Sequence, residues 1–240
     1  MRARKIPPHL LERPVSLLSA ELADLIRRAP DRVCEVLAPL LVEERRERIE
    51  AVVASRTRSI VVVLDHLDDP HNGAAILRTA EAMGLMEVHA IQANGVWDLS
   101  RRVTQGCHKW VDVVVHRDVD HCATSLERRG YLLLAASETA EPCWSIIPPD
   151  RPVALCLGNE HFGIGEALRR RCWGEVGIPM RGFTRSLNVS VAAAVLISHL
   201  MEGRRNELEK DEQTRLRARY YALSVRSALE VLRRTNEPGE

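Results

Sequence analysis

Three loops that follow predicted β-strands carry polar residues able to bind a ligand or to catalyse a reaction. The first loop leads to Asn72 and Arg78, the second contains Glu160, and the third contains Ser186 and Asn188. In open α/β folds, ligands bind beyond the carboxyl ends of the parallel strands, so groups in these loops can act together. Taken singly, Asn72, Glu160, Ser186 and Asn188 are equally well explained as helix caps, and Asn72 in particular is a good N-cap.

Arg78 is harder to explain as a structural residue. It lies two turns into a predicted helix, among Ile76, Leu77 and Ala80. On such an apolar helix we expect its charged head to find a partner or to open into a cleft.

Several familiar sites are absent from the sequence. It contains no G-x-G-x-x-G after the first predicted strand, no G-x-x-x-x-G-K-[ST], no H-E-x-x-H and no G-x-S-x-G. Their absence argues against the common nucleotide-phosphate, zinc-peptidase and serine-hydrolase sites. The six cysteines form no C-x-x-C pair and no spaced Cys/His ligand set, so we expect no metal, and reduced thiols in the cytoplasm.

The elements that position these loops are six short apolar runs with the length and β-branching of buried strands. Helical stretches separate most of the runs, and this alternation predicts an α/β domain with a mostly parallel sheet and helices on both faces. No apolar run reaches the roughly 18 residues of a membrane span, so we expect a soluble protein. The runs are residues 60–64, 87–91, 111–115, 131–136, 153–157 and 175–178.

Helical extensions are predicted on both sides of this domain. Ser19 can cap a first helix, and Asp31 can cap a second one that is broken or bent by Pro39 and runs on through the charged segment 43–52. A last helix is predicted from Asp211 to Arg234. The expected domains are an N-terminal helical extension that is a candidate for RNA recognition, a catalytic domain and a C-terminal basic helix, over residues 1–57, 58–205 and 206–240.

The charge is unevenly distributed along the chain. The whole sequence has 34 basic and 33 acidic residues, and only Lys5, Lys109 and Lys210 of the basic residues are lysine. Residues 214–234 contain six arginines against Glu230 alone. This local excess indicates either a solvated helix face or contact with phosphate groups. The arginines predicted to contact RNA are Arg215, Arg217, Arg219 and Arg226.

In order and spacing, the three loops resemble the three motifs of the SpoU branch of the SPOUT RNA methyltransferases. The matching segments are PHNGAAILRTAEAMG (70–84), LCLGNEHFGI (155–164) and IPMRGFTRSLNVSVAAA (178–194). EVHAI (87–91) and GCHKWV (106–111) narrow the resemblance to the TrmH type, which methylates the ribose 2′-hydroxyl of a D-loop guanosine in tRNA. The similarity extends from about Ile60 to about Glu202.

The resemblance implies a SPOUT fold, whose parallel sheet ends in a deep C-terminal trefoil knot that binds S-adenosylmethionine. A knot would be an exception to the rule that chains do not thread loops. In the family, backbone and apolar side chains of three loops hold the adenine. The corresponding cofactor-binding residues are Ala136, Leu157, Gly158, Ile178, Met180 and Leu187.

The resemblance also implies catalytic roles. Arg78 matches an essential arginine, Asn72 the asparagine that supports it, Glu160 the glutamate of the second motif, and Ser186 and Asn188 the pair of the third. The family proposal makes the arginine a base, although a guanidinium group holds its proton very strongly. Our hypothesis is that Arg78 stays cationic, bridges a substrate phosphate and stabilises the developing alkoxide.

The partners implied by the resemblance are tRNA and a second copy of the chain, because sites of this family are completed across a homodimer interface. The leading hypothesis is a cytoplasmic tRNA 2′-O-methyltransferase. Ribosomal RNA or another tRNA position is the alternative substrate. A non-catalytic RNA-binding or assembly protein on the same fold is an alternative of another class, although such a protein would be expected to lack Arg78, Glu160 or Asn188.

Overall fold

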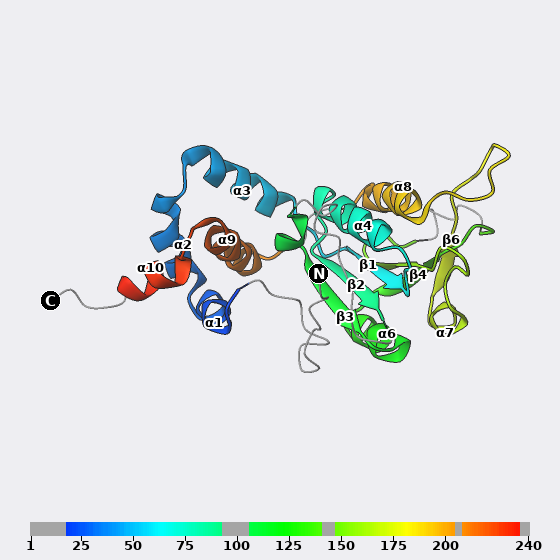
Figure 1. Ribbon diagram of the computed structural model, residues 1–240, viewed down its shortest axis with the longest axis horizontal. Helices are drawn as coiled ribbons and strands as arrows, with labels where there is room; N and C mark the ends of the chain where they lie inside the picture. The colour runs from blue at the N-terminus through cyan, green and yellow to red at the C-terminus, as the bar shows by residue number, and fades with distance from the viewer. Residues whose placement is uncertain (1–17, 93–105, 141–146, 205–207, 236–240) are drawn as a thin grey trace. The chain divides into compact units, whose positions relative to one another are not determined.

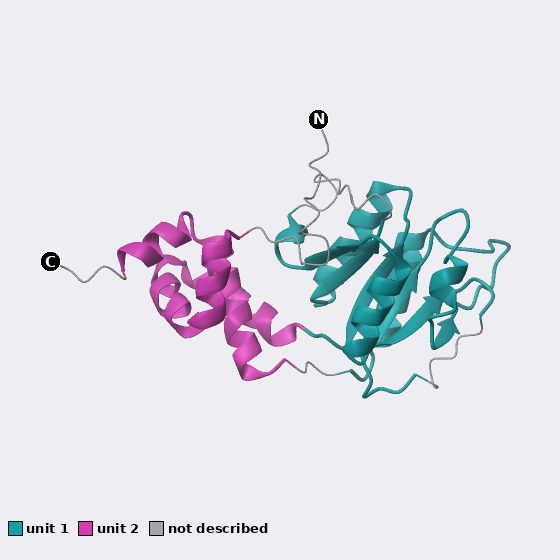
Figure 2. Ribbon diagram, turned by 90° about the horizontal axis from the view of Figure 1, so that it is seen from below, with its two compact units in different colours: residues 1–15, 57–205 teal, residues 16–56, 206–240 magenta. Residues whose placement is uncertain are grey.

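The protein folds as two compact units (Figure 2). The computed structural model describes residues 18–92, 106–140, 147–204 and 208–235. One unit contains Thr57–Arg205, and the other joins Ser16–Arg56 to Asn206–Glu240. The two extensions predicted from the sequence therefore belong to a single helical unit. Residues 1–17 and 236–240 of those extensions lie outside the described residues.

A six-stranded sheet forms the centre of the larger unit, in the order β3-β2-β1-β5-β4-β6 (Figure 1). All neighbouring strands pair in parallel. In the register of β1, Val62 lies opposite Val88 of β2 on one side and Leu155 of β5 on the other. The predicted mostly parallel α/β sheet is thus confirmed. The strands are β1 (Ile60–Asp65), β2 (Glu87–Ile91), β3 (Asp112–His116), β4 (Leu132–Ala136), β5 (Val153–Leu157) and β6 (Gly174–Val176).

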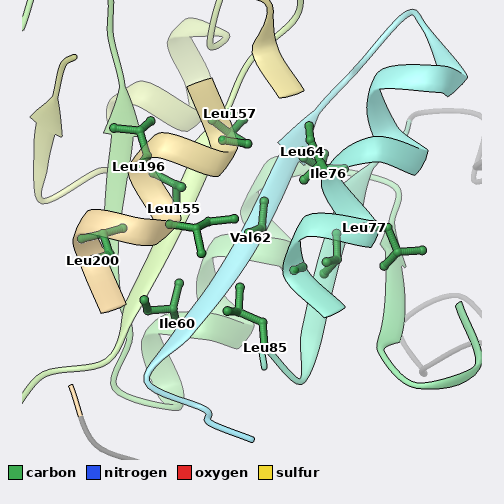
Figure 3. Close-up of a cluster of buried hydrophobic side chains, with 14 of the residues drawn as sticks. Ile60, Val62, Leu64, Ile76, Leu77, Leu85, Leu155, Leu157, Leu196 and Leu200 are labelled. Atoms are coloured by element: carbon green, nitrogen blue, oxygen red, sulfur yellow. The ribbon is translucent and has the colours of Figure 1, made fainter. Parts of the chain in front are cut away.

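Helices pack on both faces of this sheet. The alternating side chains of β1 separate two cores, because Ile60, Val62 and Leu64 point to one face and Val61 and Val63 to the other. Figure 3 shows side chains of β1 among those of α4 and α8 in the first core. Burying each of these aliphatic side chains contributes about 1.5–3 kcal/mol. The first core is covered by α4 (Pro70–Ala82), α8 (Val189–Met201) and η3 (Cys107–Lys109), and the second by α6 (Val119–Arg128) and α7 (Glu166–Arg169).

The second unit is entirely helical where it is described. Buried Leu37, Val53 and Leu216 contribute to its interior. Beside them, Glu50 accepts hydrogen bonds from Arg217 Nε at 2.7 Å and from Tyr221 Oη at 2.9 Å. Its elements are α1 (Ala20–Arg28), α2 (Pro30–Leu37), η2 (Ala38–Leu40), α3 (Glu43–Ser55), α9 (Lys210–Ser224) and α10 (Ala228–Arg234).

Two of the predicted helix caps differ in outcome. Ser19 does cap α1, since its Oγ accepts from the backbone N of Leu22 at 3.2 Å. The prediction for Asp31 was wrong, because Ala29 is the N-cap of α2 and Asp31 lies in its first turn. Pro30 occupies the first helical position, where its missing N–H costs nothing.

Two predicted helices are interrupted. The helix expected to be broken or bent by Pro39 is broken there, since α2 ends at Leu37, η2 follows, and α3 begins after an extended stretch at Leu41 and Val42. The C-terminal helix breaks between α9 and α10 at Ser227, whose φ of 55° lies in the left-handed region. None of the described helices is long and apolar enough to cross a membrane.

Candidate active site

The site begins at helix α4, whose cap is Asp69. Its carboxylate accepts from the backbone N of His71 at 2.8 Å, and Pro70 follows as the first helical residue. This hydrogen bond, followed by that from the His71 side chain, lowers the pKa of Asp69. The expectation that Asn72 is the cap was therefore wrong, and its side chain is released for other contacts.

Asn72 connects the three predicted loops. Its Nδ2 donates to Glu160 Oε1 at 2.8 Å, and its Oδ1 accepts from Asn188 Nδ2 at 3.1 Å. The second oxygen of Glu160 accepts from the backbone N of Asp68 at 3.2 Å. Asn188 is also the N-cap of α8, since its Oδ1 accepts from the backbone N of Ser190 at 2.9 Å. Three of the predicted catalytic residues thus form one hydrogen-bonded chain.

The loop after β5 is tightly folded against itself. A Cβ on Gly158 would lie 2.0 Å from the carbonyl carbon of Gly163, so only glycine fits there. Asn159 ties this loop to the one after β1, because its Nδ2 donates to Asp68 Oδ2 at 2.7 Å and to the carbonyl of His66 at 3.0 Å. Sequence reasoning missed Asn159, although its place directly after a buried strand and a glycine is the signal that could have identified it.

Asp65 is a second residue that the sequence analysis missed. It is the last residue of β1 and is only 4% exposed. One of its oxygens accepts from the backbone N of Gly165 at 2.8 Å, and the other lies 2.7 Å from Nδ1 of His66. An acidic residue at the end of a central strand was the available signal. Its role is to hold together the loops after β1 and β5.

A cavity of about 340 Å³ opens beside these loops. All six residues predicted to bind the cofactor line it, and so do Glu160, Ser186 and Asn188. Its wall combines apolar side chains with backbone of tight turns and with a few polar groups, a composition typical of small-molecule sites. Residues of the lining that were not predicted include Ser137, Glu138, Asn159 and Arg185. Ser137 and Glu138 directly follow β4, which was the available signal for them.

Arg78 lies away from this cavity. The buried side of α4 contains Ile76, Leu77 and Ala80, whereas Arg78 is exposed and does not line the cavity. Within the described ranges it forms no ion pair and no hydrogen bond. The expectation that Arg78 needs a partner or a cleft in its own chain was therefore wrong, because the helix presents it to solvent. Of the five predicted catalytic residues, four are brought together and Arg78 is not.

The predicted RNA-binding arginines differ in their surroundings. Arg215 and Arg226 are exposed, and Arg219 is half-buried. Arg217 is paired with Glu50, and this contact raises the pKa of Arg217 and lowers that of Glu50. Arg217 donates through Nε to both carboxylate oxygens of Glu50, so it has a partner within its own unit, and its contact with RNA stays a prediction.

Comparison with known sequences identifies a family. The SpoU rRNA Methylase family profile matches residues 59–198. The tRNA (guanosine(18)-2′-O)-methyltransferase of Thermus thermophilus is 37% identical over 169 residues, which cover 70% of this chain and 85% of that protein.

Comparison with solved structures agrees with the sequence match. The crystal structure of the Aquifex aeolicus TrmH/SpoU tRNA modifying enzyme superposes with a TM-score of 0.68 and 25% identity, covering 77% of this chain and 98% of that one. The SpoU methyltransferase AviRb of Streptomyces viridochromogenes, solved in complex with its cofactor AdoMet, has a TM-score of 0.55 and 22% identity. It covers 62% of this chain and 60% of its own, and at this identity it shows the fold alone.

Proposed function

This chain belongs to the SpoU rRNA methylase family, and we propose that it is an S-adenosylmethionine-dependent tRNA 2′-O-methyltransferase acting on guanosine 18 of the D-loop. The observation that carries this proposal is the cavity beside the Asn72–Glu160–Asn188 hydrogen-bonded chain. The Thermus thermophilus relative, which bears that activity in its name, supports the choice of substrate.

The cavity residues fit the cofactor. A volume of about 340 Å³ lies in the range of small-molecule sites. Leu157, Ile178 and Leu187 offer apolar surface for an adenine ring, and Gly158 lines the same cavity. When bound, S-adenosylmethionine supplies an electrophilic methyl group on its sulfonium sulfur.

The residues around the cavity position the reactants. Asn72, Glu160 and Asn188 hold the three loops in one arrangement through their mutual hydrogen bonds. A fixed arrangement lets binding energy align the ribose hydroxyl with the methyl group, which is a large source of rate acceleration. Ser186 lines the same cavity and can donate a hydrogen bond to either reactant.

Arg78 supplies the positive charge. An exposed guanidinium group retains its proton at neutral pH, so it acts better as a cation than as a base. It binds an RNA phosphate next to the target and stabilises the alkoxide that forms as the 2′-hydroxyl loses its proton. The proton passes to that phosphate or to water.

The position of Arg78 supports a homodimer. In its own chain Arg78 does not line the cavity, so the site is incomplete without a second copy that brings this group to it. Large apolar side chains near the cavity are exposed, with Phe183 fully exposed and Val191 48% exposed. Covering such residues favours association between copies.

Close backbone contacts support the trefoil knot. A Cβ on Gly177, after β6, would lie 1.9 Å from the carbonyl oxygen of Ala140, which follows β4. After α8, the Arg204 side chain donates to the carbonyl oxygens of Pro148 and Arg151 at 3.3 and 2.6 Å. The chain from 177 to 204 therefore contacts both ends of the segment between β4 and β5, as expected if it passes through that loop.

Ribose-methylation mapping of tRNA and rRNA from a strain lacking the protein tests the substrate. We expect loss of the 2′-O-methyl group at guanosine 18 of tRNA, with the rRNA methylation pattern intact. We also expect the protein in the cytoplasm, together with its tRNA substrate. An unchanged D-loop guanosine together with a lost rRNA mark would overturn the proposal. Calorimetry with S-adenosylmethionine tests the non-catalytic alternative, since a pure RNA-binding protein would give no binding heat.

A further inference from the structure

A row of polar side chains is buried between the sheet and helix α6. His89 on β2 and His116 on β3 are each 1% exposed, and Cys122 on α6 is fully buried. One donor atom from each of these three residues lies within 4.8 Å of the other two. Burying polar groups is costly unless they are hydrogen-bonded or bind an ion, so the partners of each ring nitrogen decide whether the cluster can accept an ion.

The second nitrogen of each imidazole is already held. His89 Nε2 lies 3.2 Å from Glu87 Oε2, and His116 Nδ1 lies 3.2 Å from His121 Nδ1. This leaves His89 Nδ1 and His116 Nε2 facing each other at 2.9 Å. A histidine whose outer nitrogen donates to a carboxylate, with its inner nitrogen free to bind, is the usual arrangement around protein-bound metals.

The carboxylate behind His89 is itself held in place. Arg129 binds Glu87 with both of its terminal nitrogens, at 2.7 and 2.9 Å, and Arg58 also pairs with it. The fixed carboxylate in turn orients the His89 ring through the contact of Glu87 Oε2 with His89 Nε2.

We propose that His89, His116 and Cys122 bind a Zn²⁺ ion. Two neutral imidazoles and one thiolate suit this borderline-soft cation, and a water molecule can complete a tetrahedron. On binding, the proton between the two facing nitrogens shifts to Nδ1 of His116, which faces His121, so both rings remain neutral. The two facing nitrogens must move apart to about 3.3 Å to admit the ion. The ion also replaces the thiol proton of Cys122, and this one proton is released to solvent.

The site is structural and separate from the catalytic cavity. Its ligands come from β2, β3 and α6, whereas the cavity is lined mainly from the ends of β4, β5 and β6 and from α8. A bound ion ties the edge strand to its neighbour and to the helix above them, and stabilises the fold because it binds only the folded state. The sequence analysis predicted no metal, because these three ligands lie far apart along the chain and form no spaced motif.

Titration of the chelator-treated full-length protein with Co²⁺, followed by Zn²⁺, tests this proposal. Co²⁺ should bind one equivalent with tetrahedral d–d bands and a thiolate-to-cobalt charge-transfer band, and Zn²⁺ should abolish both. Cys122→Ser should lose the charge-transfer band. Cys172→Ser is the matched control and should retain it, because Cys172 is a free, largely buried thiol that hydrogen-bonds to the Leu168 carbonyl instead.

Two results would overturn the proposal. One is a wild-type Co²⁺ spectrum without the charge-transfer band, and the other is a band that persists in Cys122→Ser. A second measurement covers the case of a poorly folded serine variant. Zn²⁺ should raise the Tm of wild-type protein by about 5 °C and leave that of His116→Asn unchanged, and equal shifts would place the ion on surface histidines such as His71.

Discussion

The two units draw their stability from different interiors, because strands buried on both faces form the core of the larger unit and the other unit is helical. Arginine–carboxylate pairs occur in both units, as in Arg129–Glu87 and Arg217–Glu50. Arg78 of the larger unit, by contrast, is exposed and forms no ion pair among the described residues. The comparison teaches that an arginine's role depends on which side chains the packing brings within its reach.

The largest effect is expected from removing the unpaired cation. Arg78→Ala should lower kcat by about 100- to 1000-fold, because the charge that stabilises the alkoxide is lost. Binding of S-adenosylmethionine should be unchanged, since Arg78 does not line the cavity. Steady-state kinetics and calorimetry measure the two quantities.

Arg78→Lys distinguishes Arg78 acting as a base from Arg78 acting as a cation that contacts phosphate. A lysine variant with substantial turnover and a pH optimum moved toward the lower pKa of an ammonium group would show that Arg78 acts as a base, against our proposal. A variant with weak turnover and an unchanged pH profile supports a guanidinium that contacts phosphate.

The next effect concerns the tightly packed loop after β5. Gly158→Ala should lower the free energy of unfolding by about 2–3 kcal/mol and weaken cofactor binding, because the added Cβ would overlap the backbone of Gly163. Gly182→Ala is the matched control, since its Cβ would meet nothing within 4 Å. Equal losses in the two variants, measured by denaturant unfolding and calorimetry, would contradict the assigned packing.

A smaller effect separates the exposed from the paired arginines of the helical unit. Replacing Arg215 and Arg226 together by alanine should raise KM for tRNA roughly 10-fold, and should reduce the salt dependence of binding by about one to two phosphate contacts. Stability should be unaffected because both side chains are exposed. Arg217→Ala should do the reverse, lowering Tm with little change in salt dependence. Equal changes in KM, salt dependence and Tm in the two variants would contradict the assignment of Arg215 and Arg226 to RNA binding and of Arg217 to stability.

The smallest effect is the pH dependence of the Glu50 pair. The hydrogen bond from Arg217 lowers the pKa of Glu50, so the pair stabilises the folded state above the ordinary glutamate pKa of about 4.3. This contribution is lost as the pH falls through the lowered value. Because Glu50 is 41% exposed, the loss should stay within about 1 kcal/mol. Thermal unfolding of wild type and Glu50→Gln between pH 3 and 7 measures it, and a variant with the same pH dependence as wild type would contradict the assignment.

Much of the fold was determined by local sequence. The six apolar runs became the six strands, because β-branched side chains flanked by turns suit strands buried on both faces. The loops after β4, β5 and β6 line one cavity because parallel strands align their carboxyl ends, and Asn72 after β1 is joined to that lining through Glu160 and Asn188. The resemblance to the SpoU motifs, and not strand alignment, assigned the cofactor residues that line this cavity.

Tertiary structure decided the contacts between residues that are distant along the chain. Whether Asn72 caps a helix or binds Glu160 depended on Asp69 taking the cap. The sequence left Arg217 as either a solvated residue or a phosphate contact, and only the structure shows its hydrogen bond to Glu50, 167 residues earlier. His89, His116 and Cys122 have no motif spacing, and only the pairing of β2 with β3 beneath α6 brings them together. Local propensity acts over a few residues, whereas these roles depend on which side chains the completed packing brings within bonding distance.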